Sequence, residues 1–302
     1  MNAPADRTRF TDVRRVEETG STNDDLMELG RQGEAEGIVL AAAHQTVGRG
    51  RHGRRWTAPP GSSLLCSVLL RPPAAVADLV TAAVAVALQD AVTSLGVTGV
   101  GIKWPNDLIV TGATDERPPR PGHGHLVGRK LAGILAEVDV PTGSSAASGP
   151  RIPSDAERVL VVVGAGVNVH TPDALPADIA DRFVALDALA APAPSVDAVL
   201  AAYLAALEAT YAGLLADRQA LLDRWRERCV TIGRDVRVDL GARDLEGRAI
   251  GIDGRGRLVV RTDGGDEVAV AAGDVVHLVG GTRADGPGPV PGKSGASPTV
   301  SG

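Results

Sequence analysis

The residues best suited to chemistry form one short run, Gly48-Arg49-Gly50-Arg51-His52-Gly53-Arg54-Arg55-Trp56, with four arginines and three glycines. From Gly37 to Ala77 the chain contains no Asp or Glu, so no carboxylate close in sequence can neutralise these arginines. Guanidinium groups bind carboxylates and phosphates through paired hydrogen bonds, and glycines let a loop bend around such an anion. The run therefore predicts a loop that binds an anion supplied from outside the chain.

Composition alone leaves three interpretations of this loop open: a solvated basic turn, a nucleic-acid contact or a phosphate-binding loop. Gly48, Gly50 and Gly53 also satisfy the pattern G-x-G-x-x-G, but that fingerprint requires a helix directly after it. Pro59 and Pro60 follow instead and would break a helix, so we reject a dinucleotide-binding turn.

Further polar clusters occur at the predicted ends of strands or on adjoining loops. Ser21-Thr22-Asn23 predicts the capped start of a helix, and a helix start is also a site for a polar or anionic ligand. The other clusters are Gln45 before the arginine run, Lys103-Trp104-Pro105-Asn106-Asp107, Lys130 with Gly133, and Gly164-Ala165-Gly166 with Asn168. One such cluster is a weak signal, whereas their combination indicates a single site.

The composition of the chain bounds its class. Its 302 residues suffice for one large and one small domain, and 44% of them are hydrophobic. Aromatic residues make up only 2%, so the core must consist of Ala, Val, Leu and Ile. The net charge of −6 argues against a general binder of polyanions and makes the basic run a local feature.

Cysteine usage and the absence of targeting signals predict a cytoplasmic protein. Cys66 and Cys229 lie far apart, which indicates neither a disulfide framework nor a metal site and fits a reducing compartment. The N-terminus has no apolar signal core, and no run approaches 18 uninterrupted apolar residues, so we expect no transmembrane helix. His123 and His125 do not have zinc-ligand spacing, so we expect no metal there.

Apolar segments predict several strands joined by loops, with few helices. We expect strands at 10–16, 37–43, 62–70, 108–110, 130–138 and 158–163, and helices at 21–29, 74–95, 195–215 and 218–228. Regular alternation of strand and helix is missing. The chain is therefore predicted to be α+β, with a largely antiparallel sheet flanked by helices.

The C-terminal part has a different pattern of apolar and polar residues. Short alternating strands are expected at 236–238, 247–250, 258–260, 268–270 and 275–278, which predicts a small β-barrel. We expect a catalytic domain over 1–231, the barrel over 232–280 and a disordered tail over 281–302. Within the first domain, 1–9 is expected to be disordered and 44–56, 111–128 and 141–157 to be mobile loops.

The clusters, taken in this order, resemble the biotin protein ligases. The specific motifs are Gly-Arg-Gly-Arg-x-Gly-Arg-x-Trp, Lys-Trp-Pro-Asn-Asp and Lys-Leu-Ala-Gly-Ile-Leu, and the resemblance covers most of the chain. It implies a fold similar to class II aminoacyl-tRNA synthetase cores with an SH3-like barrel behind. It also implies a ligase that activates biotin with ATP as biotinyl-5'-adenylate and transfers it to a lysine of a biotin carboxyl carrier protein domain.

The resemblance also assigns residues by motif position. It implies catalytic roles for Lys130, Arg49 and Arg51. Biotin contacts are implied for Ser21, Thr22, Asn23, Gln45, Arg49, Gly50, Arg51, Lys130, Gly133, Gly164 and Gly166. The nucleotide side would hold Arg54, Trp56, Lys103, Asn106, Asp107, Ala165 and Asn168. ATP and Mg²⁺ would be co-substrates, Asp107 is a weak Mg²⁺ candidate, and no tightly bound cofactor is expected.

Two alternatives to biotin ligation are weighed. A lipoate or octanoate ligase on the same scaffold usually carries an Arg-Arg…Gly-Gly-Gly pattern, which is missing here. A non-catalytic nucleic-acid or ligand-sensing protein fits poorly with the net charge, and barely 20 residues precede Ser21, so we expect no DNA-binding role. The expected partner is the carrier domain of a biotin-dependent carboxylase, with no DNA and no membrane, and the interpretation allows for a homodimer.

Overall fold

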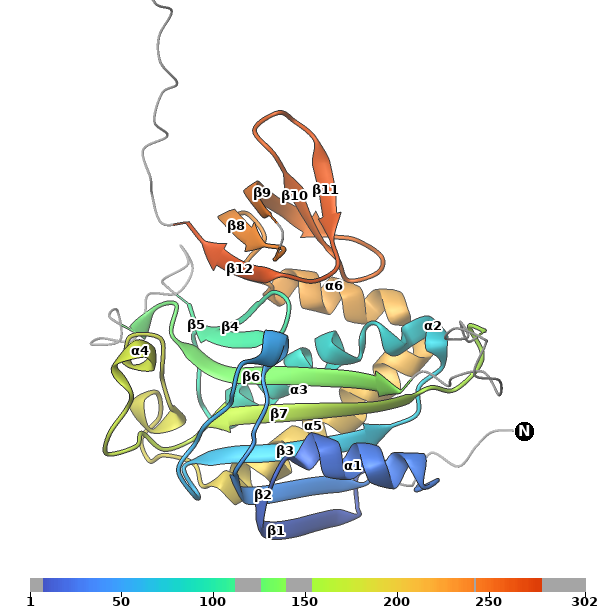
Figure 1. The fold of residues 1–302 in the computed structure, drawn as a ribbon, viewed down its shortest axis with the longest axis vertical. Helices are drawn as coiled ribbons and strands as arrows, with labels where there is room; N and C mark the ends of the chain where they lie inside the picture. The colour runs from blue at the N-terminus through green and yellow to red at the C-terminus, as the bar shows by residue number, and fades with distance from the viewer. Residues whose placement is uncertain (1–7, 112–125, 140–153, 242, 279–302) are drawn as a thin grey trace, which may run out of the picture.

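The computed structural model describes residues 8–111, 126–139, 154–241 and 243–278. A large sheet of seven strands forms the centre of the molecule, and a smaller sheet of five strands lies beyond one edge of it (Figure 1). The large sheet contains Val13–Thr19 (β1), Val39–Gln45 (β2), Ser63–Leu70 (β3), Val100–Lys103 (β4), Asp107–Val110 (β5), Lys130–Asp139 (β6) and Leu160–Asn168 (β7). The small sheet contains Asp235–Asp239 (β8), Asp244–Ile252 (β9), Leu258–Arg261 (β10), Glu267–Val270 (β11) and Asp274–His277 (β12).

The order of strands in the large sheet is β1-β2-β3-β7-β6-β5-β4. Every neighbouring pair is antiparallel except β1 and β2, which are parallel. A parallel pair needs a crossover connection, and the helix α1 (Thr22–Arg31) supplies it. The predicted α+β class with a largely antiparallel sheet is therefore confirmed.

Helices cover both faces of the large sheet. The remaining helices are Ala74–Ala77 (α2), Val80–Ser94 (α3), Ala177–Ala180 (α4), Val196–Ala216 (α5) and Arg218–Arg228 (α6). α3 and α5 pack against each other and against one face, whereas α1 packs against β3 and β7 on the other (Figure 1). α6 lies between this helical layer and the small sheet (Figure 1).

The core is aliphatic, as the composition requires, and has two parts. The main cluster lies between the sheet and the helices α3 and α5 and continues into the small sheet. A separate small cluster holds α1 on the other face and contains Leu26, Met27, Ile38, Leu40, Leu69, Leu160 and Val162. The position of α1 therefore depends on few side chains.

α5 is the one helix among the described residues that is long and apolar enough to cross a membrane by length and composition alone. The sequence contains no uninterrupted apolar run of that length, and polar residues such as Glu208 interrupt the helix. Tyr203, Leu207 and Tyr211 of α5 are fully buried against the rest of the protein. The packing is that of a core helix.

The structure differs from the sequence predictions at several elements. The predicted helix over 74–95 is divided at Asp78 and Leu79, because Leu79 turns into the core while Asp78 pairs with Arg218. β4 was not predicted as a strand, and β1 begins three residues later than expected. Gly30 does not end α1 but lies within it, where a Cβ would come within 2.6 Å of Leu160 and prevent close packing on β7.

Some predictions fall on residues outside the described ranges. These are residues 1–7 of the predicted disordered N-terminus, most of the loops 111–128 and 141–157, the pair His123 and His125, and all of the tail 281–302. They stay predictions. For Arg9 the prediction of disorder is wrong, because its guanidinium forms ion pairs with Glu36 and Glu208.

Candidate functional site

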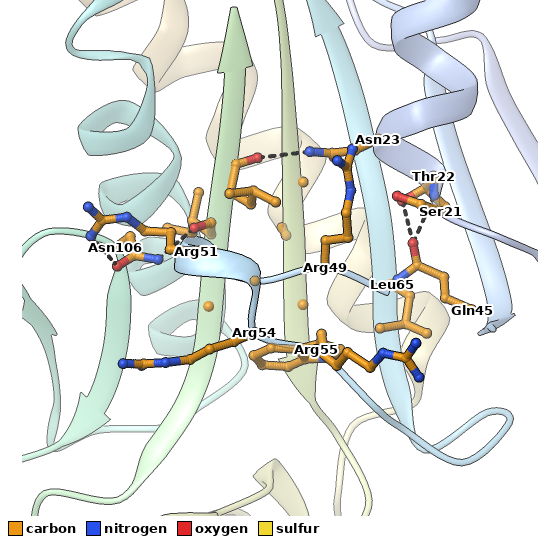
Figure 2. A pocket seen from close by; sticks show the side chains of 18 of the residues that line it. Ser21, Thr22, Asn23, Gln45, Arg49, Arg51, Arg54, Arg55, Leu65 and Asn106 are labelled. Atoms are coloured by element: carbon orange, nitrogen blue, oxygen red, sulfur yellow. Dashed lines mark hydrogen bonds between the residues drawn. The ribbon is translucent and has the colours of Figure 1, made fainter. Parts of the chain in front are cut away.

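A pocket opens above the large sheet, between the start of α1, the loop 48–56 and the strands β3, β6 and β7 (Figure 2). All of the predicted site residues line it except Lys103 and Asn168. The topology explains this gathering, because β3, β7 and β6 are adjacent in the sheet although they are far apart in sequence.

One end of the pocket is closed by uncharged polar side chains. Ser21 is the N-cap of α1 and accepts the N–H of Asp24 at 3.5 Å, as predicted. Gln45 Oε1 accepts both the backbone N–H of Thr22 at 2.8 Å and its hydroxyl at 3.1 Å (Figure 2). The helix start and the end of β2 are thereby held together.

Asn23 continues this polar end and is itself buried. Its Nδ2 donates to the carbonyl of Leu135 at 3.2 Å and to Glu137 Oε2 at 2.7 Å, and its Oδ1 accepts from Ser67 Oγ at 2.6 Å. Ser67 Oγ also lies 2.6 Å from Thr22 Oγ1. Sequence reasoning missed both Ser67 and Glu137.

Two glycines permit close contacts that any other residue would block. A Cβ at Gly164 would lie 2.4 Å from Asn23 Oδ1, and one at Gly166 would lie 2.7 Å from the Trp56 ring. Gly133 lies under the same ring. At these glycines the groups that approach the backbone are therefore side chains of this chain, Asn23 and Trp56.

The loop 48–56 is folded as a compact turn. A backbone bridge joins Arg49 to Arg55, and the N–H of Trp56 donates to the carbonyl of Gly48 at 3.0 Å. At the tip His52 adopts φ 55° and Gly53 adopts φ 72°, the left-handed conformation that lets the chain reverse. The predicted mobility of the loop 44–56 stays a prediction.

The arginines of this loop are not all unpaired, which corrects the inference from the local sequence. Arg49 contacts Asp24 and Glu137, the latter at 3.1 Å, and Arg54 contacts Asp274 of the small sheet. These carboxylates come from distant parts of the chain. Because the pairs are substantially exposed, an incoming anion can replace them at small cost.

Arg51 differs from its neighbours. Within the described part of the chain, its side chain contacts Asn106 Oδ1 at 3.3 Å and the carbonyl of Gly273 at 3.4 Å, with no ion pair (Figure 2). Burial lowers the pKa of the Arg51 guanidinium from its ordinary value, and Asp107 partly offsets this effect. A half-buried cation with only neutral partners is suited to an anion that enters the pocket.

Lys130 lies at the start of β6, facing both the loop and the sheet. Its Nζ forms an ion pair with Asp107 Oδ1 at 2.7 Å and lies 5.2 Å from the centre of the Trp56 ring. The indole N–H of Trp56 is buried without a hydrogen-bond partner among the described residues. Asn106 donates to the carbonyl of Ile134 at 2.7 Å and so ties the Asp107 segment to β6.

The two predicted residues outside the pocket have other surroundings. The amide of Asn168 donates to the backbone carbonyls of Lys130 at 3.2 Å and Val184 at 3.1 Å, which holds the beginning of β6 in place. Lys103 is half-buried, and desolvation lowers the pKa of its ammonium group.

The pocket also contains residues that sequence reasoning missed: Arg55, Leu65, Cys66, Ile134, Leu135 and Asp274. Leu65 pairs with Gly166 and Cys66 with Ala165, and this register could not be derived from composition. Burial raises the pKa of the Cys66 thiol to about 12, so the thiol stays neutral at physiological pH. The alternation along β6 puts Gly133, Leu135 and Glu137 on one face, a signal that could have found Glu137.

Trp104 attaches the small sheet to this site. Its backbone N–H donates to Thr231 Oγ1 and its indole N–H to the carbonyl of Gly256, both at 3.0 Å. His277 Nε2 lies 3.0 Å from the same threonine hydroxyl. Trp104 directly precedes the Pro105-Asn106-Asp107 segment, so the pocket wall is anchored in the C-terminal sheet.

Comparison with known families gives two matches along the chain. A model described as the biotin/lipoate A/B protein ligase family matches residues 15–146. A model described as the biotin protein ligase C terminal domain matches residues 231–278.

Individual proteins give the same result over most of the length. A biotin--[acetyl-CoA-carboxylase] ligase of Mycobacterium tuberculosis is 35% identical, over 87% of this chain and 88% of its own. The bifunctional ligase/repressor BirA of Escherichia coli is 30% identical, over 81% of this chain and 67% of its own. A solved structure of the Aquifex aeolicus biotin protein ligase in complex with biotin and ATP shares the fold, with a TM-score of 0.68 at 22% identity, over 89% of this chain and 100% of that one.

Proposed function

The chain belongs to the biotin protein ligase family, and from this premise we propose that it is an ATP-dependent biotin–[acetyl-CoA-carboxylase] ligase. The observation that carries the proposal is the pocket itself, which joins an uncharged hydrogen-bonding end to a cationic end. Biotin combines an uncharged cyclic urea with a carboxylate, so its two ends match the two ends of the pocket.

The reaction has two steps. The biotin carboxylate attacks the α-phosphorus of ATP, an acyl-phosphate bond forms, and pyrophosphate leaves. The amine of a lysine on the biotin carboxyl carrier protein domain then attacks the carbonyl carbon, an amide forms, and AMP leaves with the release of one proton.

We assign the residue roles as part of the proposal. The first step brings two anions together, so cations must offset their repulsion and the charge of the transition state. Lys130 and Arg51 are suited to this role because both line the pocket, Lys130 held in place by Asp107 and Arg51 with neutral partners only. Arg49 and Arg54 would join them by exchanging their present carboxylate partners for the substrates.

The uncharged end would hold the ring of biotin. Ser21, Thr22, Asn23 and Gln45 offer hydroxyl and amide groups there without any net charge. Trp56 with Gly133 and Gly166 would cover the reacting part of the ligand, and Asn106, Asp107 and Ala165 would line the nucleotide side. Lys103 and Asn168 would act indirectly, through the strand ends that they hold.

We propose that Mg²⁺ enters with the phosphates of ATP. In the described ranges no group of three or more His, Cys, Asp or Glu side chains could hold a metal ion. Mg²⁺ bound to nucleotides often needs only one or two protein carboxylates, and Asp107 is a candidate for this. Because Asp107 forms an ion pair with Lys130, the stronger assignment for Asp107 is that it positions this lysine.

The wider assignments also belong to the proposal. We place the catalytic domain at 1–231 and the C-terminal barrel at 232–280, in a cytoplasmic enzyme without a tightly bound cofactor. DNA is not a partner, because the net charge is −6 and the basic loop faces the pocket. No membrane partner is proposed, and the enzyme acts on its carrier domain either as a monomer or as a homodimer.

Pyrophosphate release tests the function. The protein is incubated with ATP and Mg²⁺ and with biotin, lipoate or neither acid, in the absence of any acceptor. Release of about one equivalent with biotin alone is expected, because the adenylate stays bound until an acceptor arrives. Release with lipoate alone would contradict the assignment of biotin, and no release with either acid would contradict the ligase itself.

A further inference from the structure

Glu137 lies behind the closed end of the pocket and does not line it. It belongs to β6, the strand that also carries Lys130 and Gly133, and its side chain is 30% exposed. Its Oε2 accepts from Asn23 Nδ2 at 2.7 Å and from Arg49 Nη2 at 3.1 Å. A single carboxylate thus contacts a residue of each end of the pocket.

The contact determines how the amide of Asn23 is oriented. Both of its N–H groups point at groups that only accept hydrogen bonds, the carboxylate of Glu137 and the carbonyl of Leu135. The amide oxygen must therefore face the opposite way, toward Ser67 Oγ at 2.6 Å. The opposite orientation would bring the amide oxygen against two acceptors.

The orientation of Asn23 in turn determines the direction of the neighbouring hydrogen bonds. An amide oxygen only accepts, so Ser67 must give its one hydroxyl hydrogen to Asn23. Ser67 Oγ can then only accept from Thr22 Oγ1, which lies 2.6 Å away. Thr22 gives its one hydroxyl hydrogen to Ser67 or to Gln45 Oε1, and because Ser67 does not donate to Thr22, no lone pair of the Thr22 oxygen is occupied by Ser67 and the oxygen stays free to accept from a ligand.

We infer that Glu137 is a positioning residue that fixes the direction of the chain Asn23–Ser67–Thr22, so that Thr22 presents a hydrogen-bond acceptor to the ligand. This rests on the proposed function, in which the ring of biotin occupies the closed end. The cyclic urea of biotin carries two N–H donors that an acceptor can bind, whereas the dithiolane ring of lipoate carries none. Glu137 thereby contributes to selection of a urea ring without touching it.

The rival explanation is that Glu137 acts only through Arg49. The chain offers a matched control, because Asp24 contacts the same Nη2 atom of Arg49. Its side chain makes no hydrogen bond with Asn23, Ser67 or Thr22 among the contacts of the described residues. Asp24→Asn therefore removes a carboxylate from Arg49 and leaves the hydroxyl and amide chain unchanged.

The experiment compares Glu137→Gln with Asp24→Asn in the full chain. Glutamine has the size of glutamate but can also donate, so Asn23 loses the shorter of the two contacts that define its orientation and keeps only the carbonyl of Leu135. Loss of one hydrogen bond to a charged group corresponds to about a tenfold weaker interaction. We expect the KM for biotin and its Kd from calorimetric titration to rise about tenfold in Glu137→Gln, with kcat and the KM for ATP within about twofold.

Ser67→Ala interrupts the same chain at its middle and gives a second test. A comparable rise in the KM for biotin is expected, and the double variant Glu137→Gln/Ser67→Ala should be no worse than the more affected single variant, since both changes break one pathway. Unchanged melting temperatures in circular dichroism would separate positioning from misfolding. Additive effects in the double variant would overturn the inference.

The remaining outcomes are also decisive. Equal effects of Glu137→Gln and Asp24→Asn would show that Glu137 acts through Arg49, and a fall in kcat alone would exclude a role in ring recognition. If the wild type shows biotin-dependent turnover and Glu137→Gln has the same KM and Kd for biotin, this inference is overturned and the proposed function stays intact. Failure of the wild type to bind biotin would remove both.

Discussion

The closed end of the pocket and its arginine loop hold their polar groups in opposite ways. At the closed end, the buried and uncharged side chains of Thr22, Asn23 and Ser67 bond to one another at 2.6 Å. At the loop, exposed arginines contact carboxylates from distant segments, with Arg54 at 65% exposure. The first region is arranged before a ligand arrives, whereas the second must exchange its partners. Recognition is thus assigned to the rigid end and charge neutralisation to the exchangeable one.

The largest effect is expected from Lys130→Ala, which removes the cation at the boundary between the two regions. Loss of one positioned electrostatic stabiliser should lower the rate of adenylation by on the order of 10²-fold or more. The KM for biotin should change little, because the closed end is untouched. Single-turnover pyrophosphate release measures the effect, with Arg31→Ala, which pairs with Asp139 outside the pocket, as a control. Near-normal turnover in Lys130→Ala would refute the role.

Two glycine variants compare the rigidity of the regions directly. Gly164→Ala drives a methyl group against Asn23, whose hydrogen bonds prevent it from moving, so we expect a loss of about 1–3 kcal/mol of stability and a higher KM for biotin. In Gly166→Ala the added methyl group contacts the Trp56 ring. Trp56 can move together with its surface loop, so the loss of stability should be smaller. Thermal melts and KM values for both substrates measure the difference. Equal losses in the two variants would contradict the assignment of a rigid and a yielding end.

A pH titration extends the comparison to the seam with the small sheet. Burial, with smaller effects of Lys103 and Arg234, lowers the pKa of His277 from 6.5 to about 4. The unfolded chain therefore takes up the proton first as the pH falls, and stability present above pH 6.5 declines between about 6.5 and 4. Urea unfolding at a series of pH values measures this decline in the free energy of unfolding. His277→Gln should have a shallower decline in this range, and an identical pH profile would exclude the histidine as the cause.

The smallest effect is expected for the ion pair between the loop and the small sheet. Arg54→Ala should change stability by less than about 1 kcal/mol, because the pair is exposed and screened by salt. Melting temperatures at low and high ionic strength test this, and the difference between variant and wild type should shrink in high salt. A large loss that persists in salt would mean that the loop is held as rigidly as the closed end.

Much of the fold follows from local patterns in the sequence. Strands such as β3 and β7 are nearly continuous apolar runs, and α5 lies within one residue of its predicted range 195–215, with Ser195 as its N-cap. Local patterns do not indicate which strands pair or which distant segments make contact. The parallel arrangement of β1 and β2, and the turn of Leu79 into the core, depend on contacts between distant segments.

The site divides in the same way. The glycines and arginines of the pocket and Lys130 stand out in the sequence, because they fall in short motifs of unusual composition. Asp274, Glu137 and Ser67 belong to no motif, and their partners depend on which distant segments the fold brings beside them. The charge state of the loop was misjudged for this reason, since its carboxylates come from segments as distant as the last strand.

The small hydrophobic cluster beneath α1 has a consequence for how the enzyme fails. Beyond the hydrogen bonds at its start, α1 is held by these few apolar side chains and not by the main core. Segments with few buried contacts open at a lower free energy than the whole protein. Heat inactivation is therefore expected to begin with loosening of the apolar packing of α1 beyond its hydrogen-bonded start, before the main core opens. Efforts to prolong the working life of this enzyme should therefore preserve the packing of Leu26 and Leu160 before they alter the sheet.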